Sequence, residues 1–126
     1  DPLAVSVAAA RGDDLEGLVD LIALSGRRIA RRTRGRPPLD EPAALLVWDV
    51  GCLGEEDLAW LRMLVANRPA LAVVLLESFP RGEATAAALE AGARAVLGRP
   101  VTLEALEGTL ARLESTLPVA GMRGRE

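Results

Sequence analysis

Short apolar runs alternate with longer amphipathic stretches along this chain of 126 residues. Three runs cover residues 3–9, 45–50 and 71–76, and a fourth, which contains Arg94, covers residues 93–97. Runs that are this short and apolar at successive positions are typical of parallel strands with helices packed on both faces. The pattern therefore predicts at least four buried strands.

The stretches between these runs have the spacing of amphipathic helices. Asp13 and Asp14 open the first helix, and acidic residues are favourable in the first turn. Further helices are predicted at 55–67, at 82–91 and after Thr102, a suitable N-cap. Strands that alternate with helices predict an α/β fold, in which a mostly parallel sheet lies between two layers of helices.

Residues 26–42 admit two interpretations. Either the first helix continues to Thr33, or Gly26 ends that helix and residues 28–33 form a short strand. We favour the strand, which gives a sheet of five strands instead of four. The three prolines between Gly35 and Pro42 then leave room only for a rudimentary helix before the next strand.

The composition excludes several classes of enzyme. The chain has no histidine and no lysine, and all 15 basic residues are arginine. It therefore cannot contain a Ser-His-Asp triad, a histidine-ligated zinc site, a Walker-type nucleotide site or a lysine Schiff base. No Gly-x-Gly-x-x-Gly sequence follows the first apolar run, which disfavours a dinucleotide-binding domain. We predict that the chain is not an enzyme.

Residues 44–113 resemble the second half of a response-regulator receiver domain. The sequence Leu-Leu-Val-Trp-Asp-Val at 45–50 is similar to the strand that ends in the family's phospho-acceptor aspartate, here Asp49. The sequence Ala-Leu-Glu-Ala-Gly-Ala at 88–93 is similar to the family's passage from the fourth helix to the fifth strand, and Arg99 and Pro100 stand where the family has Lys-Pro. The resemblance implies a three-layer, flavodoxin-like fold and a role in two-component signal transduction.

Few of the residues that receiver phosphorylation requires are present. In the family, an acidic pair after the first strand holds magnesium, and a hydroxyl residue and a lysine contact the phosphoryl group. Here Ala9 and Ala10 stand near the place of the acidic pair, Glu77 stands at the hydroxyl position and Arg99 at the lysine position. Ser78, one residue further on, is expected to point to the opposite face of the strand.

These departures favour a pseudo-receiver. We interpret Asp13 and Asp14 as acids of a helix N-terminus, with displaced magnesium ligands as the alternative. Asp49 is then a strand-end carboxylate that accepts hydrogen bonds from backbone N–H groups. A further hypothesis is that Glu77 forms an ion pair with Arg99 across the degenerate pocket. The domain would act without phosphorylation and without a cofactor; the alternative is a phospho-acceptor at Asp49 with Mg²⁺ in a rearranged site.

Six arginines within ten residues form either an electrostatic patch or a solvated face. They are Arg27, Arg28, Arg31, Arg32, Arg34 and Arg36. No aromatic residues are interleaved with them, so binding to nucleic acid is not expected. If the cluster binds a partner, we expect an acidic protein.

In active receivers, the face made by the fourth helix, fifth strand and fifth helix commonly dimerises or meets a partner. The corresponding residues here are Ala84, Ala87, Ala88, Arg94, Glu104, Glu107 and Arg112. Small residues allow helices to approach closely, and mixed charges can fix their register. The resemblance therefore implies a homodimer or a protein partner on this face, and the alternative is a solvated surface of good helix formers.

Residues 1–117 are predicted to form the receiver-like domain, and residues 118–126 a tail or linker. The longest apolar run is far shorter than the roughly 20 residues needed to cross a bilayer, so no membrane contact is expected. One cysteine, Cys52, cannot form an internal disulfide, which is compatible with the cytoplasm. Because the chain begins at Asp1 without methionine, we expect a processed protein or a piece of a longer bacterial signalling protein.

Overall fold

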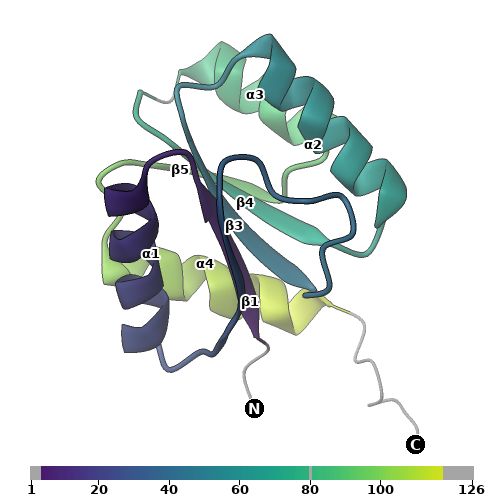
Figure 1. Cartoon of the computed structure of the whole chain (residues 1–126). Coiled ribbons are helices and arrows are strands. Elements are labelled where there is room, and N and C mark those ends of the chain that lie inside the picture. Colours follow the sequence, from purple (N-terminus) through teal and green to yellow (C-terminus); the bar gives the residue numbers. More distant parts are fainter. Residues whose placement is uncertain (1–3, 80, 118–126) are drawn as a thin grey trace, which may run out of the picture.

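The computed structural model describes residues 4–79 and 81–117, in which five strands alternate with four helices (Figure 1). The strands are β1 (Val5–Ala9), β2 (Ile29–Arg34), β3 (Leu45–Gly51), β4 (Ala72–Glu77) and β5 (Ala95–Gly98). The helices are α1 (Gly12–Leu24), α2 (Glu55–Asn67), α3 (Gly82–Ala91) and α4 (Leu103–Thr116). The predicted tail at 118–126 lies outside the described residues.

All five strands lie parallel in one sheet, in the order β2-β1-β3-β4-β5. This is the strand order of the flavodoxin-like fold, so the predicted fold class is confirmed, including the strand that we favoured after Gly26. The rudimentary helix predicted before β3 is wrong. Residues 35–44 form turns and bends, because their prolines remove backbone donors and restrict the residues that precede them.

Successive side chains of a strand point to opposite faces of the sheet, so both faces are apolar. Two helices cover each face. Val7, Val47 and Val74 belong to a core that includes the buried leucines of α1 and α4. Leu46 and Val73 belong to a second core with α2 and α3. Figure 1 shows the two helix pairs on opposite sides of the sheet. Among the described residues, every helix is too short or too polar to span a bilayer.

Hydrogen bonds hold the connection between β2 and β3 in place. The indole N–H of Trp60 in α2 donates to the carbonyl oxygen of Pro37 at 2.7 Å. The buried carboxylate of Glu41 accepts from the hydroxyl of Ser6 and from the backbone N–H of Ala43. Since buried polar groups need such partners, these bonds give the loop one defined path over the α2 side of the sheet.

The turn from α3 into β5 requires a glycine. Gly92 has a φ of +122°, which side-chain-bearing residues rarely adopt. A Cβ atom at this position would also lie 2.8 Å from Cγ2 of Val65 in α2. Gly92 thus lets α3 end directly against α2, so that β5 can enter the sheet beside β4.

Candidate functional site

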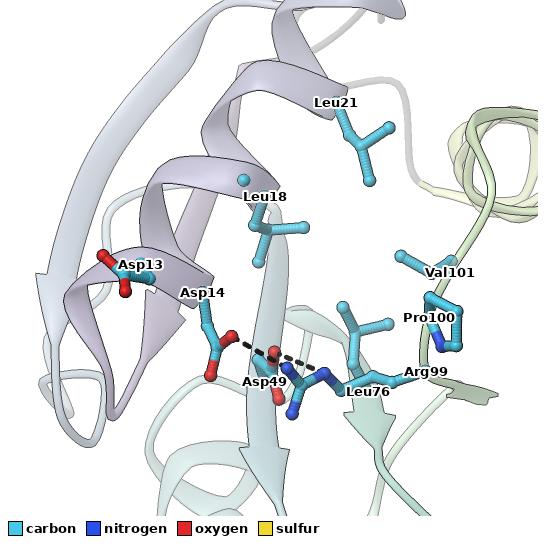
Figure 2. A pocket seen from close by; sticks show the side chains of 10 residues that line it. Asp13, Asp14, Leu18, Leu21, Asp49, Leu76, Arg99, Pro100 and Val101 are labelled. Atoms are coloured by element: carbon cyan, nitrogen blue, oxygen red, sulfur yellow. Dashed lines mark hydrogen bonds and ion pairs between the residues drawn. The ribbon is translucent and has the colours of Figure 1, made fainter.

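Three charged side chains meet at the carboxyl edge of the sheet (Figure 2). Asp49 lies near the end of β3, Arg99 follows β5, and Asp14 lies in the first turn of α1, just after β1. Parallel strands end at the same edge, so these residues come together although they are far apart in the sequence. This edge is the usual ligand position of open α/β sheets.

The guanidinium group of Arg99 bridges the two carboxylates. Its Nη2 lies 2.8 Å from Oδ1 of Asp14, and its Nε lies 3.2 Å from Oδ2 of Asp49. Its Nη1 donates to the hydroxyl of Ser78 at 3.1 Å, and the Arg99 backbone N–H donates to the carbonyl oxygen of Glu77 at 3.0 Å. Each guanidinium nitrogen therefore has a partner, which fixes the group between α1 and β3.

Asp49 is the most deeply buried member of this group, with 5% of its surface exposed. Its Oδ1 accepts a hydrogen bond from the backbone N–H of Gly51 at 3.0 Å, as expected for a strand-end carboxylate. Burial raises the pKa of Asp49 above its ordinary value, while Arg99 and the Gly51 N–H oppose part of that increase. The charged form of Asp49 thus depends on contacts from within the chain.

Two predictions about this site are wrong. Glu77 does not pair with Arg99, because its Oε2 accepts a hydrogen bond from the backbone N–H of Leu53 at 3.3 Å. Ser78, expected to point away, contacts Arg99 instead. The reason is that β4 ends at Glu77, so the alternation of side chains within the strand does not extend to Ser78.

Asp13 and Asp14 both lie in the first turn of α1, but they have different surroundings. Figure 2 shows Asp14 directed at Arg99 and Asp13 directed away from it. The interpretation as acids of a helix N-terminus therefore suffices for Asp13. It is incomplete for Asp14, which also forms an ion pair with the residue that follows β5.

Comparisons place this geometry among known structures. No protein-family model matches the sequence, and no curated protein is significantly similar to it. A putative pilus assembly protein (cpaE) from Burkholderia thailandensis is 28% identical, with a TM-score of 0.83 over 90% of this chain and 99% of that one. A CheY-like protein (tadZ) from Pseudomonas aeruginosa is 25% identical, with a TM-score of 0.67 over 91% of this chain and 96% of that one. A response regulator from Thermotoga maritima is 17% identical, with a TM-score of 0.76 over 92% of this chain and 100% of that one.

The chain has the fold of response-regulator receiver domains, and the predicted resemblance to that family is confirmed. Domains of this family are regulatory, and their role is in signal transduction. The resemblance found at residues 44–113 thus extends to the whole described fold. The first 43 residues, which resemble the family weakly in sequence, supply β1, α1 and β2 of the same sheet.

The family's magnesium ion does not fit the side chains at this edge. Ala9 ends β1 and Ala10 follows it, so no acidic pair stands there. Arg99 already offsets one of the two negative charges that Asp14 and Asp49 bring together. Across residues 4–79 and 81–117, no three His, Cys, Asp or Glu side chains are grouped so that they could hold a metal. A guanidinium in contact with both carboxylates repels a divalent cation and offers it no oxygen ligand.

A pocket of about 220 Å³ opens beside the charged group of the receiver domain. Helix α1 contributes Gly17, Leu18 and Leu21 to its wall, and the segment after β5 contributes Pro100 and Val101 (Figure 2). The charged side chains lie at one end and apolar side chains line the rest. Pro100, predicted as part of the degenerate pocket, therefore lies on its wall and makes no charged contact.

The predicted arginine cluster is not one patch. Arg27 is buried, and its guanidinium donates to both carboxylate oxygens of Glu114, at 2.8 and 2.6 Å, and to Glu107. These hydrogen bonds hold the pKa of Arg27 above its ordinary value. Arg31 and Arg36 pair with acidic residues at the surface, whereas Arg28, Arg32 and Arg34 are exposed on or beside the edge strand β2. Arg27 is thus a structural clamp between the α1–β2 turn and α4.

The predicted partner face is also smaller than expected. Ala88 is 0% exposed, because this side of α3 packs against the sheet. Glu107 contacts Arg27, so its carboxylate is already engaged within the domain. The other predicted positions lie at the surface: Ala84 and Ala87 are half-buried, and Arg94, Glu104 and Arg112 are exposed. A partner face on α3, β5 and α4 stays a prediction for these five residues.

Proposed function

We propose that this receiver domain is a pseudo-receiver: a regulatory protein-interaction domain of bacterial signalling that works without phosphorylation of Asp49, without a cofactor and without catalysing a reaction. The observation that supports this proposal is the bridge that Arg99 forms between Asp14 and Asp49. One positive charge of the chain itself stands against both carboxylates, at the edge where a receiver binds its ion and phosphoryl group.

The geometry leaves Asp49 poorly suited to attack a phosphoryl donor. A nucleophilic carboxylate needs a free oxygen atom, and a divalent cation normally offsets the charge of the incoming group. Here Oδ2 faces Arg99, Oδ1 accepts from Gly51, and the side chain is almost completely buried. An approach to Asp49 would first have to displace Arg99 from Asp14 and Ser78 as well.

The residues that respond to phosphorylation in the family are also altered or engaged in this domain. In the family, a hydroxyl residue and a lysine respond to the phosphoryl group; here Glu77 stands at the hydroxyl position, and Arg99, at the lysine position, already contacts Ser78. We therefore propose that the domain presents a constant surface to its partner. Because one similar structure is described as a putative pilus assembly protein, we propose pilus assembly as the process that this domain regulates from the cytoplasm. The partner, or a second copy, would bind at the exposed residues of α3, β5 and α4.

Incubation with acetyl phosphate and magnesium, followed by intact mass measurement, tests the proposal. We expect the wild-type domain to gain no phosphoryl group under conditions that modify an ordinary receiver. Arg99→Ala tests whether the Arg99 bridge is what prevents phosphorylation, because it removes the bridging cation and leaves both carboxylates in place. A wild-type mass gain of one phosphoryl that is lost in Asp49→Asn would overturn the proposal.

That outcome would favour the alternative function, a phospho-acceptor at Asp49 with a rearranged magnesium site. One observation supports this alternative: Asp14 is directed toward the same guanidinium as Asp49, so removal of Arg99 would leave two carboxylates facing one space (Figure 2). In that case, Asp14→Asn should abolish the magnesium-dependent phosphorylation of Asp49, and Asp13→Asn should leave this phosphorylation intact.

A further inference from the structure

At this edge of the sheet, the carboxylate of Glu77 has one oxygen atom without a hydrogen-bond partner. Glu77 ends β4 and is 6% exposed. Its Oε2 accepts one hydrogen bond from the backbone N–H of Leu53, and its buried Oε1 accepts none. A buried carboxylate oxygen without a donor costs free energy and is rare in native proteins, so the chain by itself leaves this carboxylate incompletely satisfied.

Glu77 lines a pocket of about 350 Å³, which we name the Glu77 pocket. The other lining residues are Cys52, Leu53, Phe79 and Arg81. None of them lines the pocket beside Arg99, so the two sites are separate. Phe79 is 75% exposed, which is unusual for a large aromatic side chain. A carboxylate beside an accessible aromatic ring is the combination that binds an organic cation, through charge and through the ring face.

The surroundings of the Glu77 pocket are predominantly acidic. Helix α2 begins two residues after Leu53 and carries Glu55, Glu56 and Asp57 in its first turn; α3 carries Glu83 in its first turn. Glu56 and Asp57 pair with Arg36, whereas no ion pair involves Glu55, Glu77 or Glu83 within the described part of the chain. Among the residues that line the pocket, Glu77 is acidic and Arg81 is basic, and no ion pair joins the two; Glu55 and Glu83 lie in the first turns of the helices that follow the lining segments. The charge of this surface therefore complements a basic partner.

We propose that the Glu77 pocket binds an arginine side chain of a basic segment in a partner protein. The guanidinium pairs with the carboxylate of Glu77, and its flat face lies against the ring of Phe79, which a planar, weakly hydrated cation does better than an ammonium group. This contact specifies the partner that the proposed interaction role requires, so it rests on that role. It does not depend on whether Asp49 accepts a phosphoryl group.

A titration followed by backbone amide NMR tests this inference, with N-acetyl-arginine methylamide as the probe. We expect saturable shifts at the amides of Leu53, Glu77 and Phe79, with a dissociation constant of about 1–10 mM, as suits a single side chain. The corresponding citrulline compound has the same shape without the charge and should cause no saturable shift. Absence of saturation with the arginine probe, or equal shifts with citrulline, would overturn the inference.

Three variants locate the binding. Glu77→Gln should weaken binding by about tenfold, because it removes the charge and keeps the shape. The matched control Glu90→Gln, an exposed glutamate of α3 outside this acidic set, should change binding less than about twofold, since an exposed charge is screened. Arg81→Ala should leave binding intact or strengthen it. Unchanged binding in Glu77→Gln, or its loss in Arg81→Ala, would contradict the assignment of Glu77 as the recognition group.

A further variant keeps the test decisive if Glu77→Gln fails to fold. Phe79→Ala changes an exposed side chain and should weaken binding about threefold through loss of the ring contact. Unchanged binding in this variant would also count against the inference. The two proposals fail in distinguishable ways: phosphorylation of Asp49 would refute the pseudo-receiver and leave arginine binding as it is, whereas absent arginine binding would leave the phosphorylation result untouched.

Discussion

Asp49 and Glu77 occupy similar places and have opposite surroundings. They lie near the ends of the adjacent strands β3 and β4, and both are almost completely buried, at 5% and 6% exposure. Asp49 receives an ion pair and a hydrogen bond from its own chain, whereas one oxygen of Glu77 receives nothing. Asp49, at the family's phospho-acceptor position, is thus paired within the chain, whereas the neighbouring carboxylate of Glu77 has an oxygen atom without a partner.

The difference has a geometric origin. Arg99 follows β5, and its side chain extends past the end of β4 to reach Asp49 on β3, with Ser78 as an intermediate contact. No comparable arginine reaches Glu77 among the described residues. A buried carboxylate without a cation costs more free energy than one that is paired, and this difference is the basis for proposing Glu77 as a recognition group.

The largest expected effect follows from removal of the internal cation. Arg99→Ala leaves Asp49 buried and unpaired near Asp14, so the free energy of unfolding should fall by about 2–3 kcal/mol. Urea denaturation measures this loss, and the exposed Arg94→Ala should change stability by less than about 0.5 kcal/mol. Equal stability of the two variants would show that the bridge from Arg99 to Asp49 does not stabilise the fold.

The opposite sign is expected at Glu77. Glu77→Gln removes a buried charge whose Oε1 has no partner, and its amide oxygen can still accept from Leu53. The free energy of unfolding should therefore rise by about 1 kcal/mol. Thermal or urea denaturation measures the rise against Glu83→Gln, which should be neutral. A loss of stability would mean that Glu77 is as well compensated as Asp49.

A smaller effect is expected for the hydroxyl that contacts Arg99. Ser78→Ala removes one hydrogen bond to the guanidinium and leaves both ion pairs in place. The free energy of unfolding should fall by about 0.5–1 kcal/mol. Urea denaturation beside Ser115→Ala, an exposed serine of α4, checks this value; a loss as large as that of Arg99→Ala would make Ser78 a principal part of the bridge.

The smallest effect concerns the pH dependence of Asp49. Because its pKa is raised in the folded state, the folded domain binds more protons than the unfolded chain between the ordinary and the raised pKa, and stability falls as the pH rises through that interval. Asp49→Asn lacks this fall, so its stability relative to wild type should increase with pH there and then level off. Urea denaturation across acidic pH measures it. A relative decrease would mean that Arg99 lowers the pKa of Asp49 more than burial raises it.

Much of this fold was predictable, because strands covered on both faces must be apolar at successive positions. The runs at 45–50 and 71–76 thus correspond closely to β3 and β4. The strand at 29–34 was harder to recognise, since β2 is an edge strand with alternating exposure and its arginines also suit a helix surface. The absence of a helix at 35–44 was harder to predict. The prolines there disfavour a helix, but the path of this loop also depends on the contacts of Trp60 and Glu41, which the sequence does not reveal.

The site was less predictable, because it depends on the directions of single side chains. Residue types alone could not show that Ser78, and not Glu77, faces Arg99, since the end of β4 falls between them. Arg27 looked like one of six equivalent arginines until the packing of α4 placed Glu114 beside it. The one feature of the sequence that points to the Glu77 pocket is Phe79, an isolated aromatic residue two positions after Glu77.

The exposed arginines of β2 affect how copies of this domain can meet. One side of an edge strand has backbone groups free to pair with a strand from another molecule, and this is a common route to aggregation. Arg32 and Arg34 project into solvent along that edge, with Arg28 just before the strand begins. Two copies brought edge to edge would set like charges against each other, so continuous intermolecular sheets are disfavoured.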